Sequence, residues 1–148
     1  MKIKMCPTAF DICHFMNQYI HKRMDGEYYC DGTRAAESEF SIDVDSDINY
    51  GYEVFKLLDD DWGGWNSTPS ASKMYGVAKS WEEKYGLSLM KISHDTLTFC
   101  ANRKLEEDEI SQLSEELISI HALPCEGNDT ISIANSINNN KRITLWWD

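Results

Sequence analysis

The sequence of 148 residues predicts an α+β fold, in which three to four helices pack against a mostly antiparallel sheet. Three patterns carry this prediction. Apolar residues recur at helical spacing over residues 69–85. Two apolar runs, 87–93 and 96–102, are joined by a short turn at 94–95, which is typical of a β-hairpin. Apolar and polar residues alternate over residues 40–54, which is the period of a strand with one buried face.

We expect a single domain over residues 1–148, because neither a repeat nor a low-complexity linker interrupts the chain. At this length the chain can bury a core without support from metals or disulfides. The first helix is predicted to run from about Ala9 to Met24, with Thr8 as its N-cap and Gly26 as its end.

The segment over residues 40–54 is predicted to form two strands with a bend near residues 46–51. Its apolar residues share one parity, and its acids share the other. The apolar face is Phe40, Ile42, Val44, Ile48, Tyr50, Tyr52 and Val54, and the polar face is Asp43, Asp45, Asp47, Asn49 and Glu53. We therefore expect a strand face of acids that is open to solvent or to a partner.

Residues typical of helix starts and ends mark the next two helices. Thr68 is the expected N-cap of the second, with Pro69 at the first helical position, where its missing N–H costs nothing. Gly86 is its expected end. The third helix is expected to begin with the acids at 106–109, which the helix dipole favours in a first turn, and to end at Pro124.

A short helix over residues 130–137 and a terminal strand over 142–147 complete the predicted fold. In that strand, Trp147 shares its parity with two aliphatic residues, whereas Trp146 does not. We therefore expect Trp147, and not Trp146, to face the core.

The chain has a net charge of −11, and the charge is unevenly distributed. Residues 35–61 hold nine acids against Lys56 alone, a net −8 of that total. Binding to phosphates needs clustered Lys and Arg, so the charge argues against a nucleic-acid partner and against an anionic membrane. It favours a basic protein as partner, although a solvated acidic surface would have the same composition.

The cysteines and the N-terminus bear on localisation. The five cysteines are odd in number and not closely paired, which is typical of reduced thiols in a cytosolic protein. The N-terminus contains no uninterrupted apolar stretch of signal-peptide length, and no window approaches a membrane span. We expect a cytoplasmic protein without a membrane partner.

Four segments of the second half resemble a known family in their order. They are WGGWNSTP (62–69), SWEEKYGLSLMKISHDTL (80–97), the segment around Cys125 and the terminal LWWD (145–148). Together they resemble the bacterial domain of unknown function 4253 family, over residues 62–148. The family places a cysteine before Pro and Asp, whereas here Pro124 precedes Cys125 and Glu126. The resemblance supports the element boundaries and implies no established activity.

The residue types suggest a calcium site and a zinc site, but in both cases the spacing of the residues argues against the site. Asp43, Asp45 and Asp47 have the one-three-five spacing of a calcium loop, but Ile48 stands where that loop needs Gly and Val54 where it needs Glu. Possible zinc ligands lack the tight spacing of structural zinc sites; they are Cys6, Cys13, His14, His21 and Cys30. We expect neither a metal nor another cofactor.

Catalytic sets are equally weak. His121, Cys125 and Asp129 could supply a base, a nucleophile and an orienting acid, but no oxyanion loop or nucleophile elbow accompanies them. Gly63 and Gly64 are not followed by the Lys-Ser/Thr of a phosphate-binding loop. We assign no catalytic residue, and an enzyme is the weaker interpretation.

The sequence is therefore that of a small, acidic protein to which we assign no catalytic set. We expect an immunity-type binding protein that occludes the basic groove of a toxin, such as a nuclease. The alternative is an enzyme or a small-ligand-binding domain, with its site near the GGWN segment (63–66), Cys125 and the terminal WWD. Expected partner-binding residues are the acids of the stretch and, if it is exposed, one tryptophan beside them as an anchor: Asp43, Asp45, Asp47, Glu53, Asp59, Asp60, Asp61 and Trp62.

Overall fold

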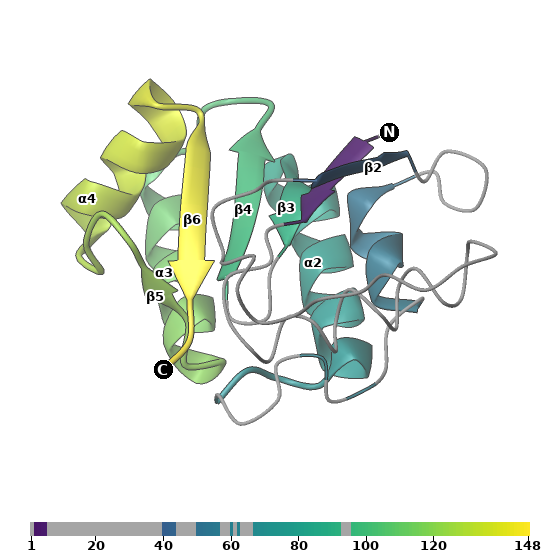
Figure 1. The fold of residues 1–148 in the computed structure, drawn as a ribbon. Helices are drawn as coiled ribbons and strands as arrows, with labels where there is room; N and C mark the ends of the chain where they lie inside the picture. The colour runs from purple at the N-terminus through teal and green to yellow at the C-terminus, as the bar shows by residue number, and fades with distance from the viewer. Residues whose placement is uncertain are drawn as a thin grey trace, which may run out of the picture.

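The computed structural model describes residues 2–5, 40–43, 50–56, 60, 62, 67–92 and 96–148, with the backbone alone at 2–5 and 40–43. Within this part of the chain, six strands form one sheet in the order β2-β1-β3-β4-β6-β5 (Figure 1). They are β1 (Lys2–Met5), β2 (Phe40–Asp43), β3 (Leu87–Ile92), β4 (Thr96–Ala101), β5 (Leu123–Pro124) and β6 (Arg142–Trp146). β1 and β3 are parallel, and all other neighbours are antiparallel. The predicted α+β fold with a mostly antiparallel sheet is therefore confirmed.

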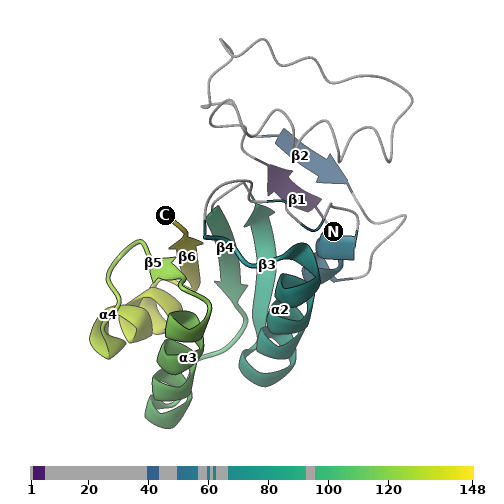
Figure 2. The ribbon, with the colours of Figure 1, turned by 90° about the horizontal axis from the view of Figure 1, so that it is seen from below.

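The described helices lie together on one face of strands β3, β4 and β6 (Figures 1 and 2). They are α2 (Ala71–Tyr85), α3 (Glu107–Ser119) and α4 (Thr130–Ala134), and α4 continues into a π-helical turn, η2 (Asn135–Asn139). A 3-10 helix, η1 (Gly51–Lys56), packs against both α2 and β3. The predicted first helix, at 9–24, lies outside the described residues.

A single apolar core fills the space between the helices and the sheet. Trp81 of α2 meets Phe99 of β4 edge to face, with ring centroids 5.2 Å apart. The α3 stripe of Ile110, Leu113 and Leu117 is buried against the same layer, as its helical spacing predicts. This core fixes how the ends of α2 and α3 are placed, and the surface features below depend on those ends.

Helix α2 begins later than the sequence predicts. Its N-cap is Ser70, whose Oγ accepts a hydrogen bond from the N–H of Lys73 at 3.1 Å. Thr68 was the expected cap and Pro69 the expected first helical residue, and both precede the helix. The reason is a tertiary contact, because the carbonyl of Pro69 accepts a hydrogen bond from Nε1 of Trp62 at 3.1 Å. The predicted end is confirmed, since Gly86 has a φ of 68° and caps the helix.

The predicted boundaries of the hairpin and of the start of the third helix hold, whereas the predicted end of the third helix does not. β3 and β4 occupy the two apolar runs of the predicted hairpin, and the turn between them lies outside the described residues. Helix α3 begins at Glu107 after a capping box between Glu106 and Glu109. It ends at Ser119, earlier than predicted, because Pro124 belongs to β5 and pairs with β6.

The second strand, predicted after the bend at residues 46–51, is wrong, because Gly51–Lys56 forms η1. Tyr52, Val54 and Phe55 are all buried there, and a strand cannot bury both Val54 and Phe55 on one face. With about three residues per turn, Tyr52 and Phe55 come to the same side. The Glu53 carboxylate also closes the turn by accepting a hydrogen bond from the N–H of Tyr50 at 3.2 Å.

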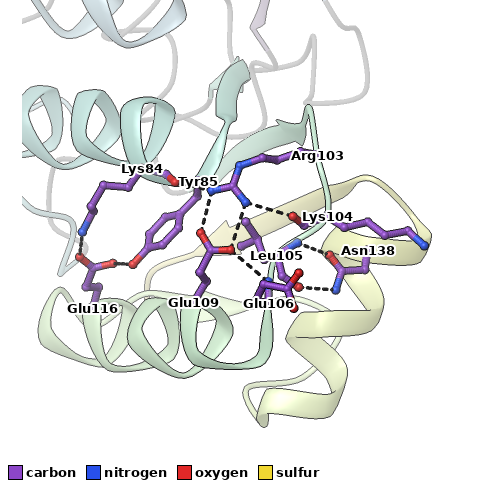
Figure 3. A network of polar contacts seen from close by, with 9 residues as sticks. All are labelled: Lys84, Tyr85, Arg103, Lys104, Leu105, Glu106, Glu109, Glu116 and Asn138. Atoms are coloured by element: carbon purple, nitrogen blue, oxygen red, sulfur yellow. Dashed lines mark hydrogen bonds and ion pairs between the residues drawn. The ribbon is translucent and has the colours of Figure 1, made fainter.

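A polar network ties α2 to α3 at one end of the molecule (Figure 3). The hydroxyl of Tyr85 donates to Oε2 of Glu116 at 2.8 Å, and the ammonium group of Lys84 pairs with the same carboxylate. Arg103 makes a two-pronged contact with Glu109, with Nη1–Oε1 at 3.1 Å and Nη2–Oε2 at 2.7 Å. Burial, and next the hydrogen bond to Glu116, raise the pKa of Tyr85, so its hydroxyl stays a donor.

The same network reaches the π-helical turn through an amide. Asn138 accepts from the N–H of Leu105 at 2.8 Å and donates to the carbonyl of Leu105 at 3.1 Å. Glu109 additionally accepts from the N–H of Glu106 at 3.1 Å. The segment between β4 and α3 is therefore held by side chains from both sides.

We predict that Glu109 makes the protein sensitive to acid. The hydrogen bond from Arg103, and next that from the Glu106 N–H, lower the pKa of Glu109 from 4.5 to about 2. Its stabilising contribution is therefore fully present above its ordinary pKa of 4.5 and is lost as the pH falls toward 2. The pair is partly exposed, so the effect is modest and is weakened by salt.

The measurement is the urea midpoint of the wild type and of Glu109→Gln from neutral pH downward. We expect the gap between the two midpoints to be largest at neutral pH and to shrink below pH 4.5. Glu107→Gln is the control, because Glu107 is an exposed acid in the same first turn. A gap that stays constant with pH would contradict this role for Glu109.

Candidate functional site

We call residues 35–61 the acidic stretch. The structure describes three of the acids in it that we expect to bind a partner. Asp43 ends β2, which is the outermost described strand on its side of the sheet. Lys2 of β1 is its register partner, so a basic position stands opposite this acid. The stretch's remaining expected partner-binding acids, Asp45, Asp47, Asp59 and Asp61, lie outside the described residues.

The two acids of the stretch whose side chains are described both accept hydrogen bonds from backbone N–H groups. Glu53 caps the turn at Tyr50, and Lys56 lies 3.9 Å from its carboxylate. Oδ1 of Asp60 accepts from the N–H of Ser72 at 2.9 Å and from its hydroxyl at 2.6 Å. These bonds, the one from the hydroxyl first, lower the pKa of Asp60. Asp60 is nevertheless exposed, so its charge still contributes to the surface potential.

Trp62 is a core residue, so the condition for an interface anchor is not met. Only 3% of its surface is exposed, and its ring meets Phe55 and Trp147 edge to face, with centroids 5.7 and 6.4 Å apart. The more exposed tryptophan of the terminal pair is Trp146, at 38%, whereas Trp147 is fully buried. This confirms the prediction that Trp147 faces the core.

The terminal WWD segment meets the chain that follows GGWN. The N–H and hydroxyl of Ser67 donate to the main-chain oxygen of Asp148 at 3.0 and 2.9 Å. The contact between Trp62 and Trp147 supports this junction from within the core. Two segments about eighty residues apart are thus brought together, as Ser67 and Asp148 are separated by 81 positions.

A cavity of about 350 Å³ opens beside this junction, and we call it the α3–β5 cavity. Figure 1 shows the end of α3, β5 and the C-terminus close together at this place. Its apolar lining residues are Leu117, Ile118, Ala122, Leu123, Pro124 and Ile133, and its polar ones are Ser67, Ser114, His121, Asn128 and Asp148. An apolar hollow with a few polar groups is the usual form of a small-ligand site.

The turn after α3 places His121 in this lining. The N–H of His121 donates to the carbonyl of Ile118 at 3.1 Å, and the N–H of Ala122 donates to that of Leu117 at 3.0 Å. His121 has a φ of 58°, a left-handed conformation that costs a residue other than glycine about 1–3 kcal/mol. His121 is a candidate base by residue type, but nothing in the sequence indicates the cavity that it lines.

The structure does not assemble the triad of His121, Cys125 and Asp129. Asp129 is the N-cap of α4, and its two carboxylate oxygens accept from the N–H and the hydroxyl of Ser132, each at 2.8 Å. These bonds, the one from the N–H first, lower the pKa of Asp129. Cys125 has an exposed side chain in the turn after β5, and its N–H donates to the carbonyl of Thr144 at 2.9 Å. The orienting acid is thus used as a helix cap.

Where the structure describes the chain, no three side chains of His, Cys, Asp or Glu come together in a way that could hold a metal ion. The considered zinc ligands, at residues 6–30, lie outside the described residues. No helix among those described is long and apolar enough to cross a membrane.

Comparison with known protein families identifies the family of this chain. The family model described as "Domain of unknown function (DUF4253)" matches residues 47–148. It begins earlier than the resemblance at 62–148 and so takes in part of the acidic stretch. No match was found among curated proteins or among solved structures. Since the matched segment is more than half of the 148 residues, this chain belongs to the DUF4253 family.

Proposed function

We propose that this protein is a cytoplasmic, immunity-type binding protein that blocks a basic protein partner, such as a nuclease toxin. The observation that carries the proposal is the charge of residues 35–61, which contain nine acids and one basic residue, Lys56. Such a surface steers a basic partner toward itself and can occupy a groove that otherwise binds nucleic acid. The exposure of Asp60 supports it, since the charge of this acid is accessible to a partner.

The direct test is to recover the partner from the producing cells with the tagged protein, washing at low and then at high salt. A partner held by charge should be retained at low salt and released at high salt, because screening weakens long-range attraction. A partner that resists high salt, or one that is acidic, would argue against the proposal.

We predict that charge changes in the acidic stretch slow association with this partner. The variant is Asp43→Asn with Asp45→Lys and Asp47→Lys; Asn is used at 43 because a lysine there would stand opposite Lys2. We expect the association rate at low salt to fall by about tenfold or more, and the melting temperature to stay level or rise.

The matched control gives the same change in net charge elsewhere: Glu107→Gln with Glu83→Lys and Glu115→Lys, three exposed positions on α2 and α3. Association that is slowed equally by both variants would mean that net charge, and not the acidic stretch, controls binding. A loss of folding in the first variant alone would contradict the assignment of these acids to an open surface.

A second candidate function is supported by the geometry of the family-like segments. Ser67, which follows GGWN, and Asp148 of the terminal WWD line the α3–β5 cavity together with Pro124, the neighbour of Cys125. This is the surrounding expected for the alternative, a domain that binds or transforms a small ligand. The two candidates differ in location, since one depends on residues 35–61 and the other on the cavity.

A further inference from the structure

Exposed apolar side chains surround the mouth of the α3–β5 cavity. Ile118 and Leu123 both line it, and they are 71% and 36% exposed. Trp146, which is 38% exposed, is the register partner of Leu123 across β5 and β6. Exposed apolar residues scattered singly are normal, but a group of them around a hollow indicates a surface that becomes covered. The helical spacing of α3 does not account for Ile118, because the buried stripe of that helix does not include it.

The polar part of the lining selects by charge. Among the described residues that line the cavity, Asp148 is the acid, His121 is the one possible base, and there is neither Lys nor Arg. A ligand anion would therefore find His121 as its one basic partner among the described lining residues, and it would approach a chain with a net charge of −11. A ligand cation would meet the Asp148 carboxylate and could donate to the oxygens of Ser67, Ser114 or Asn128.

The size limits the ligand further. A volume of about 350 Å³ is near the lower end for small-molecule sites, which suits one ring or one short branched chain. We infer that the α3–β5 cavity binds a small amine, with its apolar body against Ile118 and Leu123 and its ammonium group at Asp148. This inference rests on the second candidate function and names its class of ligand.

The test uses three probes of similar size, 2-phenylethylamine, 2-phenylethanol and phenylacetate, added to the ¹⁵N-labelled full chain at low salt. We expect the amine to shift the amide signals of Ser114, Ile118, His121 and Leu123, with a dissociation constant on the order of 1 mM for so small a ligand. The alcohol should bind several-fold more weakly, and phenylacetate more weakly still.

Four variants separate the two parts of the site. Asp148→Asn should lower the affinity for the amine by about two- to fivefold, as for an exposed ion pair, and leave the affinity for the alcohol unchanged. Glu115→Gln is its control, because Glu115 is an exposed acid outside the lining, and it should change neither affinity. Ile118→Ser should weaken both probes. Ile131→Ser should weaken neither, because Ile131 is an exposed isoleucine that lines a different hollow.

The outcomes distinguish the ligand class from the site. Equal binding of the amine and the alcohol to the wild type would overturn the ammonium assignment and leave the second candidate function standing. Shifts with none of the probes, or shifts only at amides away from the cavity, would overturn both. Neither result bears on the acidic stretch, whose partner is tested separately.

Discussion

Replacing Trp147 with alanine is expected to lower the free energy of unfolding by about 3–5 kcal/mol, the usual cost of truncating a large buried aromatic side chain. Trp147 is fully buried, meets Trp62 edge to face, and donates from Nε1 to the carbonyl of Ile120 at 2.8 Å. Its loss leaves a cavity and also an unpaired carbonyl at the end of α3. Trp146→Ala should cost far less, because Trp146 is 38% exposed.

The measurement is urea unfolding of the two single variants and the wild type, followed by circular dichroism so that loss of a tryptophan does not change the signal itself. The two tryptophans are neighbours in the chain, so they form a matched pair. Similar losses in both variants would show that this end of the sheet is covered on both faces.

Gly51→Ala is the second large effect, and it is expected to destabilise the protein by about 1–3 kcal/mol, as overpacking does in a filled core. A Cβ at this position would lie 2.2 Å from the carbonyl oxygen of Leu89, which belongs to the backbone of β3 and cannot turn away. Either η1 or β3 must shift. The substitution therefore tests whether η1 packs directly onto the strand.

Gly76→Ala is the control for Gly51→Ala. Gly76 lies inside α2, and a Cβ there would meet nothing within 4 Å. Alanine at such a helical position should stabilise the protein by about 0.5–1 kcal/mol. Opposite signs for the two variants are expected in thermal or urea unfolding. A neutral or stabilising Gly51→Ala would mean that η1 does not approach Leu89 this closely.

Local chemistry accounts for the parts of the fold that the sequence predicted well. Gly86 ends α2 because it takes a left-handed conformation, and the acids before α3 form a capping box. The β3 and β4 runs are short, mostly apolar, and adjacent in the chain. Their pairing needs no information from elsewhere.

Tertiary contacts account for the errors. The Trp62 indole N–H donates a hydrogen bond to the carbonyl of Pro69, and α2 begins at Ala71 instead of at the proline. The alternation of Tyr50, Tyr52 and Val54 suggested a strand, but burial of the next residue requires the tighter turn of η1. In both cases packing and hydrogen bonds of the folded chain override the local pattern.

The candidate site was only partly predictable for the same reason. The terminal WWD, the GGWN segment and the surroundings of Cys125 were proposed as one site, and the structure brings Ser67, Pro124 and Asp148 to one cavity. Ile118 and Asn128 gave no signal of this kind, because their role depends on how α3 and α4 end. Conversely, Trp62 was singled out for its acidic neighbours and is buried.

The most direct test of the proposed function is to record which amide signals shift when the recovered partner is added to the ¹⁵N-labelled protein. If the acidic surface binds the partner, we expect the shifts to be concentrated in residues 43–61 and to diminish at high salt. The signals of Ser114, His121 and Leu123 around the α3–β5 cavity should stay in place. Shifts centred on the cavity, with residues 43–61 unchanged, would show that the acidic surface is not the binding site.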